Sequence, residues 1–253
     1  MEEYIQGYYC LDEYTTFPKR YLTFPTNYLI LTYLHHATVQ KDGDRVLIYK
    51  TEGASTLSLT YNYTRPMEIN YVDKVKELTI YFKPFGLQQF FTDISCFTTE
   101  MFYDFNPHET FKNDMAHLLT QTEDIEQQIE NYLLMRFQRK EDLLLMELLQ
   151  QLDQGYAIED IANNLGISRQ YVSKYLKKRI GKNASDYKKI ARFRKAIQSF
   201  QEQPNQTLTQ LTYNHLFFDQ SHLIKEFKRF TKHNPKDFFD KTKLDVENVW
   251  LTI

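Results

Sequence analysis

The sequence is poor in cysteine and has no long apolar run. Its two cysteines, Cys10 and Cys96, are too few for the disulfide framework of a small secreted domain, and both are expected to be reduced and buried as small apolar side chains. No segment approaches the roughly 18 consecutive apolar residues that a membrane-spanning helix needs. The start of the chain also lacks the basic residues and apolar core of a signal peptide. These absences predict a soluble, cytoplasmic protein.

The motifs of common catalytic and cofactor sites are missing as well. The chain has no GxxxxGK phosphate-binding loop, no GxSxG nucleophile elbow, no CxxC pair and no HExxH zinc motif. His35 and His36 are neighbours on an expected strand, where successive side chains point to opposite faces, so they are poorly placed to share a metal ion. The sequence therefore predicts no enzyme, no catalytic residue, no cofactor and no metal site.

What the sequence does have is a strong charge asymmetry. The 253 residues carry a net charge of −2, and a composition of 42% hydrophobic and 25% charged residues fits one large or two medium globular domains. Residues 155–243, however, hold 18 Lys and Arg against 8 Asp and Glu, a net charge of +10, while the remainder carries −12. A basic C-terminal part is typical of nucleic-acid binding, and an acidic remainder disfavours a second nucleic-acid surface there.

The N-terminal part, residues 1–112, is rich in strand patterns and in Tyr and Phe. Leu57 and Leu59 alternate with polar residues, and residues 28–34, 46–49 and 78–82 are further short segments of β-forming residues. Turn-forming sequences lie between these segments. The pattern predicts an antiparallel sheet or a small barrel filled by bulky side chains. Such a domain has either an aromatic-lined cavity or a fully packed core, and both readings stay open.

From residue 113 the hydrophobic period changes from two to nearly four. An apolar stripe is formed by Ile125, Ile129, Leu133 and Phe137, and a second apolar run covers residues 143–152. Two helices are the simplest reading, the first packing on the sheet or against a second copy of the chain and the second covering the segment that follows. Because no Gly-, Pro- or Ser-rich linker is present, coupling between the two parts is expected to run through helix.

Residues 158–181 have the pattern of a helix, a tight turn and a second helix. Apolar or small residues recur at three-to-four spacing before Gly166, which can adopt the positive φ of such a turn, and Ser168 can cap the helix that follows. An ordinary helical hairpin with a solvated basic face would look similar on this segment alone. The polar face of the second helix carries no acid and consists of Arg169, Gln170, Ser173, Lys174, Lys177 and Lys178.

Residues 207–230 repeat this plan. Leu208, Leu211 and Leu216 mark a first helix, and Asp219 is the expected N-cap of the second. The polar face of that second helix offers Gln220, Ser221, His222, Lys225, Lys228 and Arg229. His222 is expected in a cap or on the helix surface. Two basic units in one segment favour DNA binding over a solvated hairpin.

A joining helix is predicted between the two units, over residues 185–201. It places Tyr187 and Phe193 inward and Arg192 and Lys195 outward, and Pro204 with the residue after it ends the pattern. Such a helix can hold both units in a fixed relation. Two recognition helices about one duplex turn apart, near 34 Å, could enter successive major-groove segments on one face of DNA.

These segments resemble the AraC/XylS family of transcriptional regulators. The resemblance rests on IxxIAxxLGISxxYVSKYLKKxIG at 158–181, on Tyr187 and Arg192, and on FFDQSHLIKEFKRF followed by Pro235 and Phe238, so it spans roughly residues 158–238. The chain departs from the family pattern at Thr212, Leu216, Leu223, Lys232 and Asn234, where Ala, Gly, an aromatic residue, Gly and Thr are usual. If the second turn needs a left-handed residue, Leu216 costs about 1 kcal/mol or more.

The resemblance implies an α+β protein with a β-rich, cupin-like barrel in its N-terminal domain. That domain, residues 1–112, would serve sensing or dimerisation, residues 113–140 would be a helical connector, residues 141–243 the DNA-binding domain with two helix-turn-helix units, and residues 244–253 a C-terminal tail. Residues 76–91 also resemble the N-terminal domains of one group of these regulators, in which a strand ends at a Pro and a Gly before a short helix. The implied partners are double-stranded DNA, a small-molecule effector, a second copy of the chain in a homodimer, and RNA polymerase.

The expected function is that of a sequence-specific DNA-binding transcription regulator, controlled by a small effector or a protein contact at the N-terminal domain. By position in the family pattern, Gln170, Ser173 and Lys174 reach base edges from the first unit, with Arg169 and Lys178 nearer phosphates. Lys174 stands where the family commonly has Arg, and lysine cannot hold guanine with a planar fork. In the second unit the readers are Gln220, Ser221 and Lys225. The DNA-binding set is completed by Lys177, Lys228 and Arg229.

Two other functions stay open. A protein-interaction module could use the same basic face to bind an acidic protein. A DNA-repair protein with an alkyl-transfer domain is the other alternative, but it needs a reactive cysteine in an electropositive setting, and neither Cys10 nor Cys96 lies in one.

Overall fold

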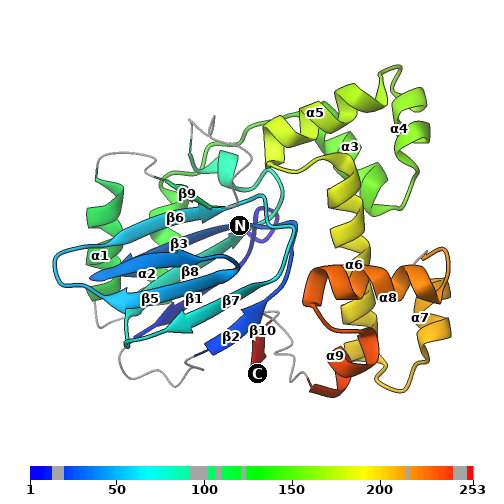
Figure 1. The fold of residues 1–253 in the computed structure, drawn as a ribbon. Helices are drawn as coiled ribbons and strands as arrows, with labels where there is room; N and C mark the ends of the chain where they lie inside the picture. The colour runs from blue at the N-terminus through cyan, green and yellow to red at the C-terminus, as the bar shows by residue number, and fades with distance from the viewer. Residues whose placement is uncertain are drawn as a thin grey trace.

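The computed structural model describes residues 1–12, 20–91, 102–105, 110–120, 124–214, 217–241 and 250–252. Two five-stranded sheets and a pair of helices form the N-terminal half, and a second group of helices lies beside the sheets, connected along one long helix (Figure 1). The fold is α+β, as predicted. Among the described helices, none combines the length and apolar character needed to cross a membrane.

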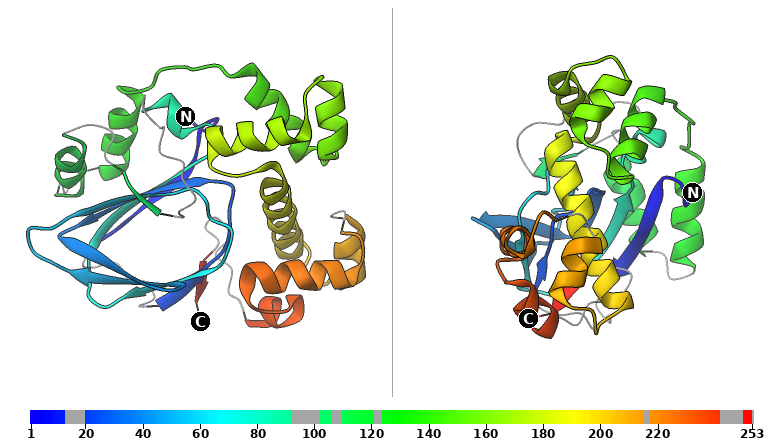
Figure 2. Two further views of the ribbon diagram at one scale, coloured as in Figure 1. Left: turned by 45° about the horizontal axis from the view of Figure 1, so that its top comes forward. Right: turned by 90° about the vertical axis from the view of Figure 1, so that its right-hand side faces the viewer.

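The strands divide into two sheets. Sheet A has the spatial order β1 (Ile5–Leu11), β8 (Lys76–Phe82), β3 (Leu29–His35), β6 (Thr56–Thr60) and β9 (Phe102–Asp104). Sheet B has the order β10 (Trp250–Thr252), β2 (Arg20–Thr23), β7 (Met67–Tyr71), β5 (Arg45–Lys50) and β4 (Ala37–Asp42). Neighbouring strands are antiparallel except β5 and β7, which are parallel. The expected cupin-like barrel is therefore not closed by hydrogen bonds in the described residues, and the sheets face each other as two layers (Figure 2).

The alternating pattern of sheet A separates two different interiors. Leu31 and Leu59 point to one side, where they share a core with residues of α1 (Phe111–Thr120) and α2 (Ile125–Leu134). Thr32, Ser58 and Thr79 point to the other side, toward sheet B and the cavity between the sheets. Polar residues in an alternating strand usually face solvent. Here they face an internal space, which the alternation alone does not reveal.

The helical connector differs from the prediction. The structure has three helices where two were expected from residue 113 onward, because α1 begins at Phe111 and precedes α2, and Phe137 lies beyond the end of α2. Residues 137–142, which lead to α3 (Leu143–Asp153), belong to no helix or strand, so irregular chain joins the two halves there instead of the expected helix.

That irregular segment is held by Gln89, which is fully buried in the short 3₁₀ helix Leu87–Gln89. The Gln89 side chain accepts a hydrogen bond from the Lys140 amide at 2.8 Å and donates one to the Lys140 carbonyl at 3.2 Å, and the Gln138 amide donates to the Gln89 carbonyl at 2.7 Å. Buried polar groups need such partners. The predicted short helix after the Pro and Gly of residues 84–86 therefore anchors the chain where it leaves the sheets.

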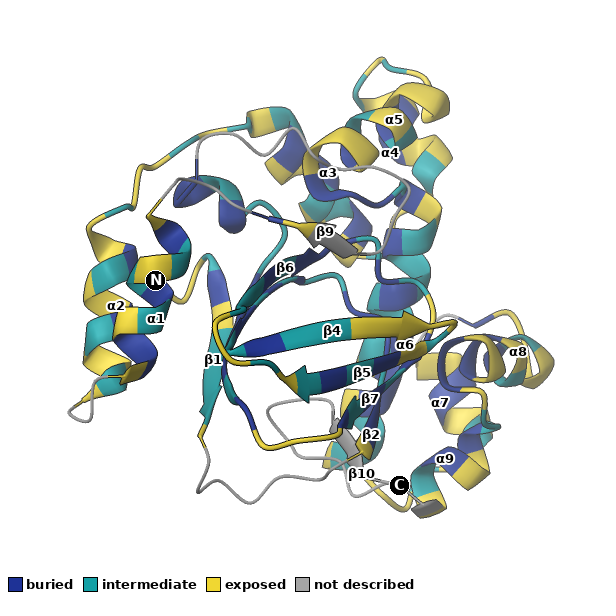
Figure 3. Ribbon diagram, turned by 60° about the vertical axis from the view of Figure 1, so that its left-hand side comes forward, coloured by how far each residue is buried: buried dark blue, intermediate teal, exposed yellow. Residues whose placement is uncertain are grey.

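The C-terminal half is built from helices around two small cores. After α3 it comprises α4 (Ile158–Asn164), α5 (Arg169–Ile180), α6 (Ala184–Glu202), α7 (Leu208–Asn214), α8 (Gln220–Thr231) and α9 (Pro235–Lys241). The first core joins α3, α4 and α5, the second joins α7, α8 and α9, and α6 contributes Ala184 and Tyr187 to the first and Phe193 and Ile197 to the second. Buried residues line the inner faces of these helices and exposed residues their outer faces (Figure 3).

The two adjacent histidines do not alternate as expected. His36 has a positive φ of 49° in the turn between β3 and β4, so its ring turns back and lies 4.1 Å from that of His35, centroid to centroid. His36 Nδ1 accepts a hydrogen bond from the Gly53 amide at 2.7 Å, and His35 Nδ1 lies 3.2 Å from the Tyr33 hydroxyl. Both rings therefore have a role in fixing local loop structure.

Candidate nucleic-acid interface

The first unit, α4 and α5, has the turn that the sequence predicts. Gly166 adopts a φ of 65°, a left-handed conformation in which a Cβ would be strained, and the Ile167 amide donates to the Ala162 carbonyl at 2.9 Å. Ser168 is the N-cap of α5, and its hydroxyl accepts from the Tyr171 amide at 3.1 Å. The predicted positive φ and the predicted cap are both confirmed.

The second unit, α7 and α8, makes the same contacts with different residues. The Phe217 amide donates to the Thr212 carbonyl at 3.1 Å, and the Asp219 carboxylate caps α8 by accepting from the His222 amide at 2.7 Å. The cap at Asp219 is confirmed. Leu216 lies outside the described residues, so its effect on the turn stays a prediction.

The two recognition helices can be compared position by position. Each has 12 residues, and each follows its cap directly. Lys174 is the sixth residue of α5 and Lys225 the sixth of α8, and both side chains are exposed. A lysine buried against protein could not reach a duplex, whereas these two occupy matching outward positions.

The first residue of each recognition helix is tied to the helix before it. Arg169 Nη1 lies 3.8 Å from Glu159 Oε2, an exposed ion pair, and Gln220 Nε2 donates to the Thr209 hydroxyl at 2.7 Å. Glu159 and Thr209 are each the second residue of their helix. The contact orients Arg169 and Gln220 along the edge between the two helices of their units.

The remaining predicted residues lie on the outer surfaces of α5 and α8. Ser173 is half-buried, and Arg229 Nη2 forms an ion pair with Asp186 Oδ1 at 3.3 Å. The exposed ones include Gln170, Lys177, Lys178, Ser221 and Lys228. The structure thus brings the predicted set together on two helices that α6 holds in one body (Figure 1).

Arg192 of α6 does not point outward as predicted. It forms an ion pair with Glu226, which is 5% exposed and sits among the apolar residues of α8. The guanidinium carbon also lies 4.8 Å from the centre of the Phe217 ring, and His222 Nε2 lies 3.2 Å from Glu226 Oε1. The sequence does contain a signal for this contact. Glu226 falls on the apolar face of the helix, between Leu223 and Phe230, where a carboxylate needs a cationic partner.

His222 takes part in the cap of α8 with both its backbone amide and its ring. Its amide is held by Asp219, and its Nδ1 accepts a hydrogen bond from the Phe218 amide at 3.3 Å. The ring is therefore engaged at the start of α8, in line with the expectation that it caps or covers the helix.

Two cations of the C-terminal half are inserted into the N-terminal half. Arg194 of α6 donates from Nη2 to the Phe24 carbonyl and from Nε to the Pro25 carbonyl, each at 2.6 Å. Lys182, 1% exposed, donates to the Tyr61 carbonyl, and burial lowers its pKa to about 7. Sequence reasoning missed both contacts, because a cation in a basic segment looks solvated until the packing is known.

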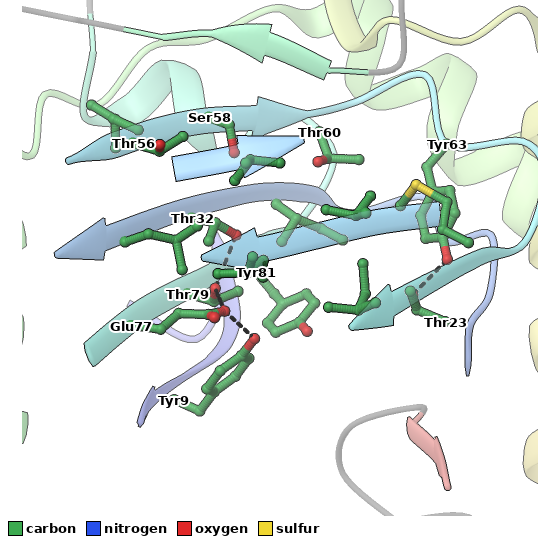
Figure 4. A pocket seen from close by; sticks show the side chains of 18 of the residues that line it. Tyr9, Thr23, Thr32, Thr56, Ser58, Thr60, Tyr63, Glu77, Thr79 and Tyr81 are labelled. Atoms are coloured by element: carbon green, nitrogen blue, oxygen red, sulfur yellow. Dashed lines mark hydrogen bonds between the residues drawn. The ribbon is translucent and has the colours of Figure 1, made fainter. Parts of the chain in front are cut away.

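A cavity of about 350 Å³ lies between the sheets, beside Arg194. Its walls include several tyrosines and hydroxyl groups of sheet A (Figure 4). At one place Glu77, 3% exposed, accepts from the hydroxyls of Tyr9 at 2.5 Å, Tyr71 at 2.5 Å and Thr79 at 2.7 Å, and burial raises the pKa of its carboxyl. Of the two readings that the sequence left open, the aromatic-lined cavity is the one found.

Comparisons with known proteins agree with the C-terminal geometry. Residues 161–241 match the family model described as a helix-turn-helix domain. No curated protein sequence matches the chain.

Several solved structures of ToxT from Vibrio cholerae show a distant likeness. One with an unsaturated fatty acid bound is 13% identical, covers 92% of this chain and 93% of its own, and has a TM-score of 0.49. A second is 11% identical with coverage of 92% and 97% and a TM-score of 0.48, and a third, from strain O395, is 13% identical with coverage of 92% and 95% and a TM-score of 0.45. A likeness at this level supports no conclusion about this chain.

A matched helix-turn-helix model, a repeated helix pair and a row of outward cations define a DNA-binding transcription regulator. Within that class, the motif residues that both units carry resemble those of the AraC/XylS family.

Proposed function

We propose that this regulator reads two successive major-groove segments, with α5 in one and α8 in the next. The observation that carries the proposal is the matched position of Lys174 and Lys225, each exposed at the same place of an equally capped 12-residue helix. Recognition helices of this class place their N-terminal part against base edges. Gln170, Ser173 and Lys174 would read bases in the first segment, and Gln220, Ser221 and Lys225 in the second.

The other cations would act on the phosphate backbone. Arg169, Lys177, Lys178, Lys228 and Arg229 lie beside the readers on the same helices, where Coulomb attraction to phosphate is independent of sequence. For Arg229 the ion pair with Asp186 must open or be shared when DNA binds. Loss of a phosphate contact should therefore weaken binding to all sequences, whereas loss of a base reader should also relax base preference.

The test begins with selection of bound duplexes from a random pool by the full-length protein. Lys174→Ala and Lys225→Ala are expected to weaken binding to the selected duplex about tenfold each and to relax base preference, each in a different half of the site. Lys178→Ala should weaken binding to all sequences and reduce the salt slope by about one. Unchanged binding in both of the first two variants would remove the assignment of readers.

A small molecule in the cavity would control this binding. Arg194 joins the cavity to α6, the helix that holds both units, and its Nη1 is shielded from solvent without a hydrogen-bond partner among the described residues. A ligand with a hydrogen-bond acceptor could satisfy that group, since an unpaired buried donor is costly. A ligand bound in the cavity would then change the position of α6 through Arg194.

The effector can be tested with a cavity-filling variant, Ser58→Trp. Compounds from a metabolite panel that raise the melting temperature of the wild type, but not of Ser58→Trp, bind in the cavity. The proposal requires that at least one of them changes affinity for the selected duplex. Cavity binders that leave DNA affinity unchanged would speak against control from this site.

The alternatives fit the structure less well. Burial raises the pKa of the Cys10 thiol to about 12, which disfavours the thiolate that alkyl transfer needs. We therefore propose no enzymatic activity, with Cys96 outside the described residues. A module that binds acidic protein would not be retained on non-specific duplex in a salt-dependent way. Cytoplasmic location, a homodimer and contact with RNA polymerase are proposed from the family resemblance.

A further inference from the structure

The second unit contains one residue that has no counterpart in the first. Ile167 and Phe217 make the same backbone contact to the helix before them. In the first unit the cap, Ser168, follows directly, but in the second Phe218 stands between Phe217 and the cap Asp219. Phe218 is thus an inserted residue at the entrance of α8.

The side chain of Phe218 is turned outward. It is 91% exposed, whereas its neighbour Phe217 is 6% exposed and fills the second core. The backbone of Phe218 is fixed, because its amide donates to His222 Nδ1 at 3.3 Å. Leaving a phenyl ring in water forgoes roughly 1.5 kcal/mol or more of burial free energy, so nothing in the fold explains its place here.

The surroundings of Phe218 belong to the proposed DNA surface. Gln220 follows two residues later, at the end of the recognition helix that enters the groove, and its contact to Thr209 brings α7 to the same edge. Tyr213, one turn after Thr209 on α7, is 85% exposed. The cations of α8 beside this edge attract a polyanion, so DNA is the partner that fits both the charge and the position.

The major groove offers one apolar group to a side chain of this kind. Thymine presents its C5 methyl there, beside polar atoms that amides and lysines read. We propose that Phe218 packs on a thymine methyl in the half of the site read by the second unit. The proposal rests on the proposed function and adds an apolar reader to a set that otherwise consists of amides, hydroxyls and cations.

Replacement of thymine by uracil tests this contact, because it removes only the methyl group. In the duplex selected by the full-length protein, each thymine is replaced singly, and the relevant half is the one in which Lys225→Ala relaxes base preference. The wild type is expected to lose about fourfold in affinity at one thymine of that half. Phe218→Ser should bind the thymine and uracil duplexes equally, and Phe218→Leu should keep part of the preference.

Leu143→Ser is the matched control, because Leu143 is an exposed apolar residue, 75% exposed, at the start of α3. It should keep the wild-type preference for thymine. The proposal is overturned if Phe218→Ser retains the fourfold preference, or if the wild type is indifferent to every methyl in that half. A failure of the second unit to contact DNA is a different result, seen when Lys225→Ala leaves affinity and base preference unchanged.

Discussion

The two helix-turn-helix units share a plan but are stabilised differently. The first has glycine at both left-handed positions, Gly166 in the turn and Gly181 at the end of α5. The second ends α8 with Lys232 at a φ of 65° and contains an ion pair between half-buried Arg192 and buried Glu226. One unit therefore depends on backbone freedom, and the other on a charge pair that must remain intact.

The largest expected effect breaks that charge pair. Arg192→Ala leaves the Glu226 carboxylate buried without its guanidinium, which should lower the free energy of unfolding by about 3 kcal/mol or more. Denaturant unfolding measures the loss, and a double-mutant cycle with Glu226→Ala isolates the coupling. If the double variant is no more stable than additivity predicts, the second unit does not depend on the pair.

The next effect is a pH dependence of stability that comes from Lys182, which follows α5 and contacts the sheet half. The pKa of Lys182 is about 7 in the folded state against 10.5 for the free side chain. Between these values the unfolded chain binds a proton that the folded chain does not, so the free energy of unfolding should rise with pH by about 1 kcal/mol per unit.

Lys182→Met should abolish this rise between about pH 7.5 and about pH 9, in unfolding titrations run beside the wild type. Lys178→Met, at an exposed lysine near the end of α5, is the control and should keep it. Identical pH dependence in the wild type and Lys182→Met would mean that Lys182 is not desolvated at the contact with Tyr61.

Smaller effects compare the two N-caps. Ser168→Ala and Asp219→Ala each remove the acceptor for an orphan amide, with an expected loss of about 1 kcal/mol. Asp219→Ala should lower the free energy of unfolding by a few tenths of a kcal/mol more than Ser168→Ala, because the carboxylate also interacts with the positive end of α8. Ser185→Ala, at an exposed site in the first turn of α6, should change little. Equal losses at both caps would show that the charge of Asp219 contributes nothing.

The smallest effect is at the end of α8. Lys232→Gly relieves the left-handed strain, while Lys232→Ala keeps it, and both lose the exposed ion pair with Asp44 at 2.9 Å, worth at most about 1 kcal/mol. Lys232→Gly should therefore exceed Lys232→Ala in melting temperature by the equivalent of about 1 kcal/mol. If Lys232→Gly is no more stable than Lys232→Ala, the left-handed conformation of residue 232 is not strained.

The elements most accessible from the sequence were those with local signals. The turn at Gly166 and the caps at Ser168 and Asp219 follow from the φ and hydrogen bonding that each residue permits, without reference to distant parts of the chain. The strand alternation at Leu57 and Leu59 likewise predicted an antiparallel sheet or a small barrel.

What the sequence did not give depends on contacts between distant segments. The contacts of Arg192, Lys182 and Arg194 form only when the DNA-binding half folds and meets the sheets. A cation carries no local mark of a partner more than twenty residues away. The connector was misread because Gln89 supplies its hydrogen bonds from elsewhere in the chain. The barrel stayed open for the same reason, since strand order is set by long-range pairing.

The return of the chain to β10 gives the DNA-binding half a second attachment. Trp250 pairs with Thr23 in sheet B, while residues 137–142 leave from the side of the 3₁₀ helix, so the helical half is tethered at both of its ends. Between these ends, Arg194 and Lys182 also bind the sheet half, so the helical half does not swing freely. Any signal from the sheets would then reach both recognition helices together.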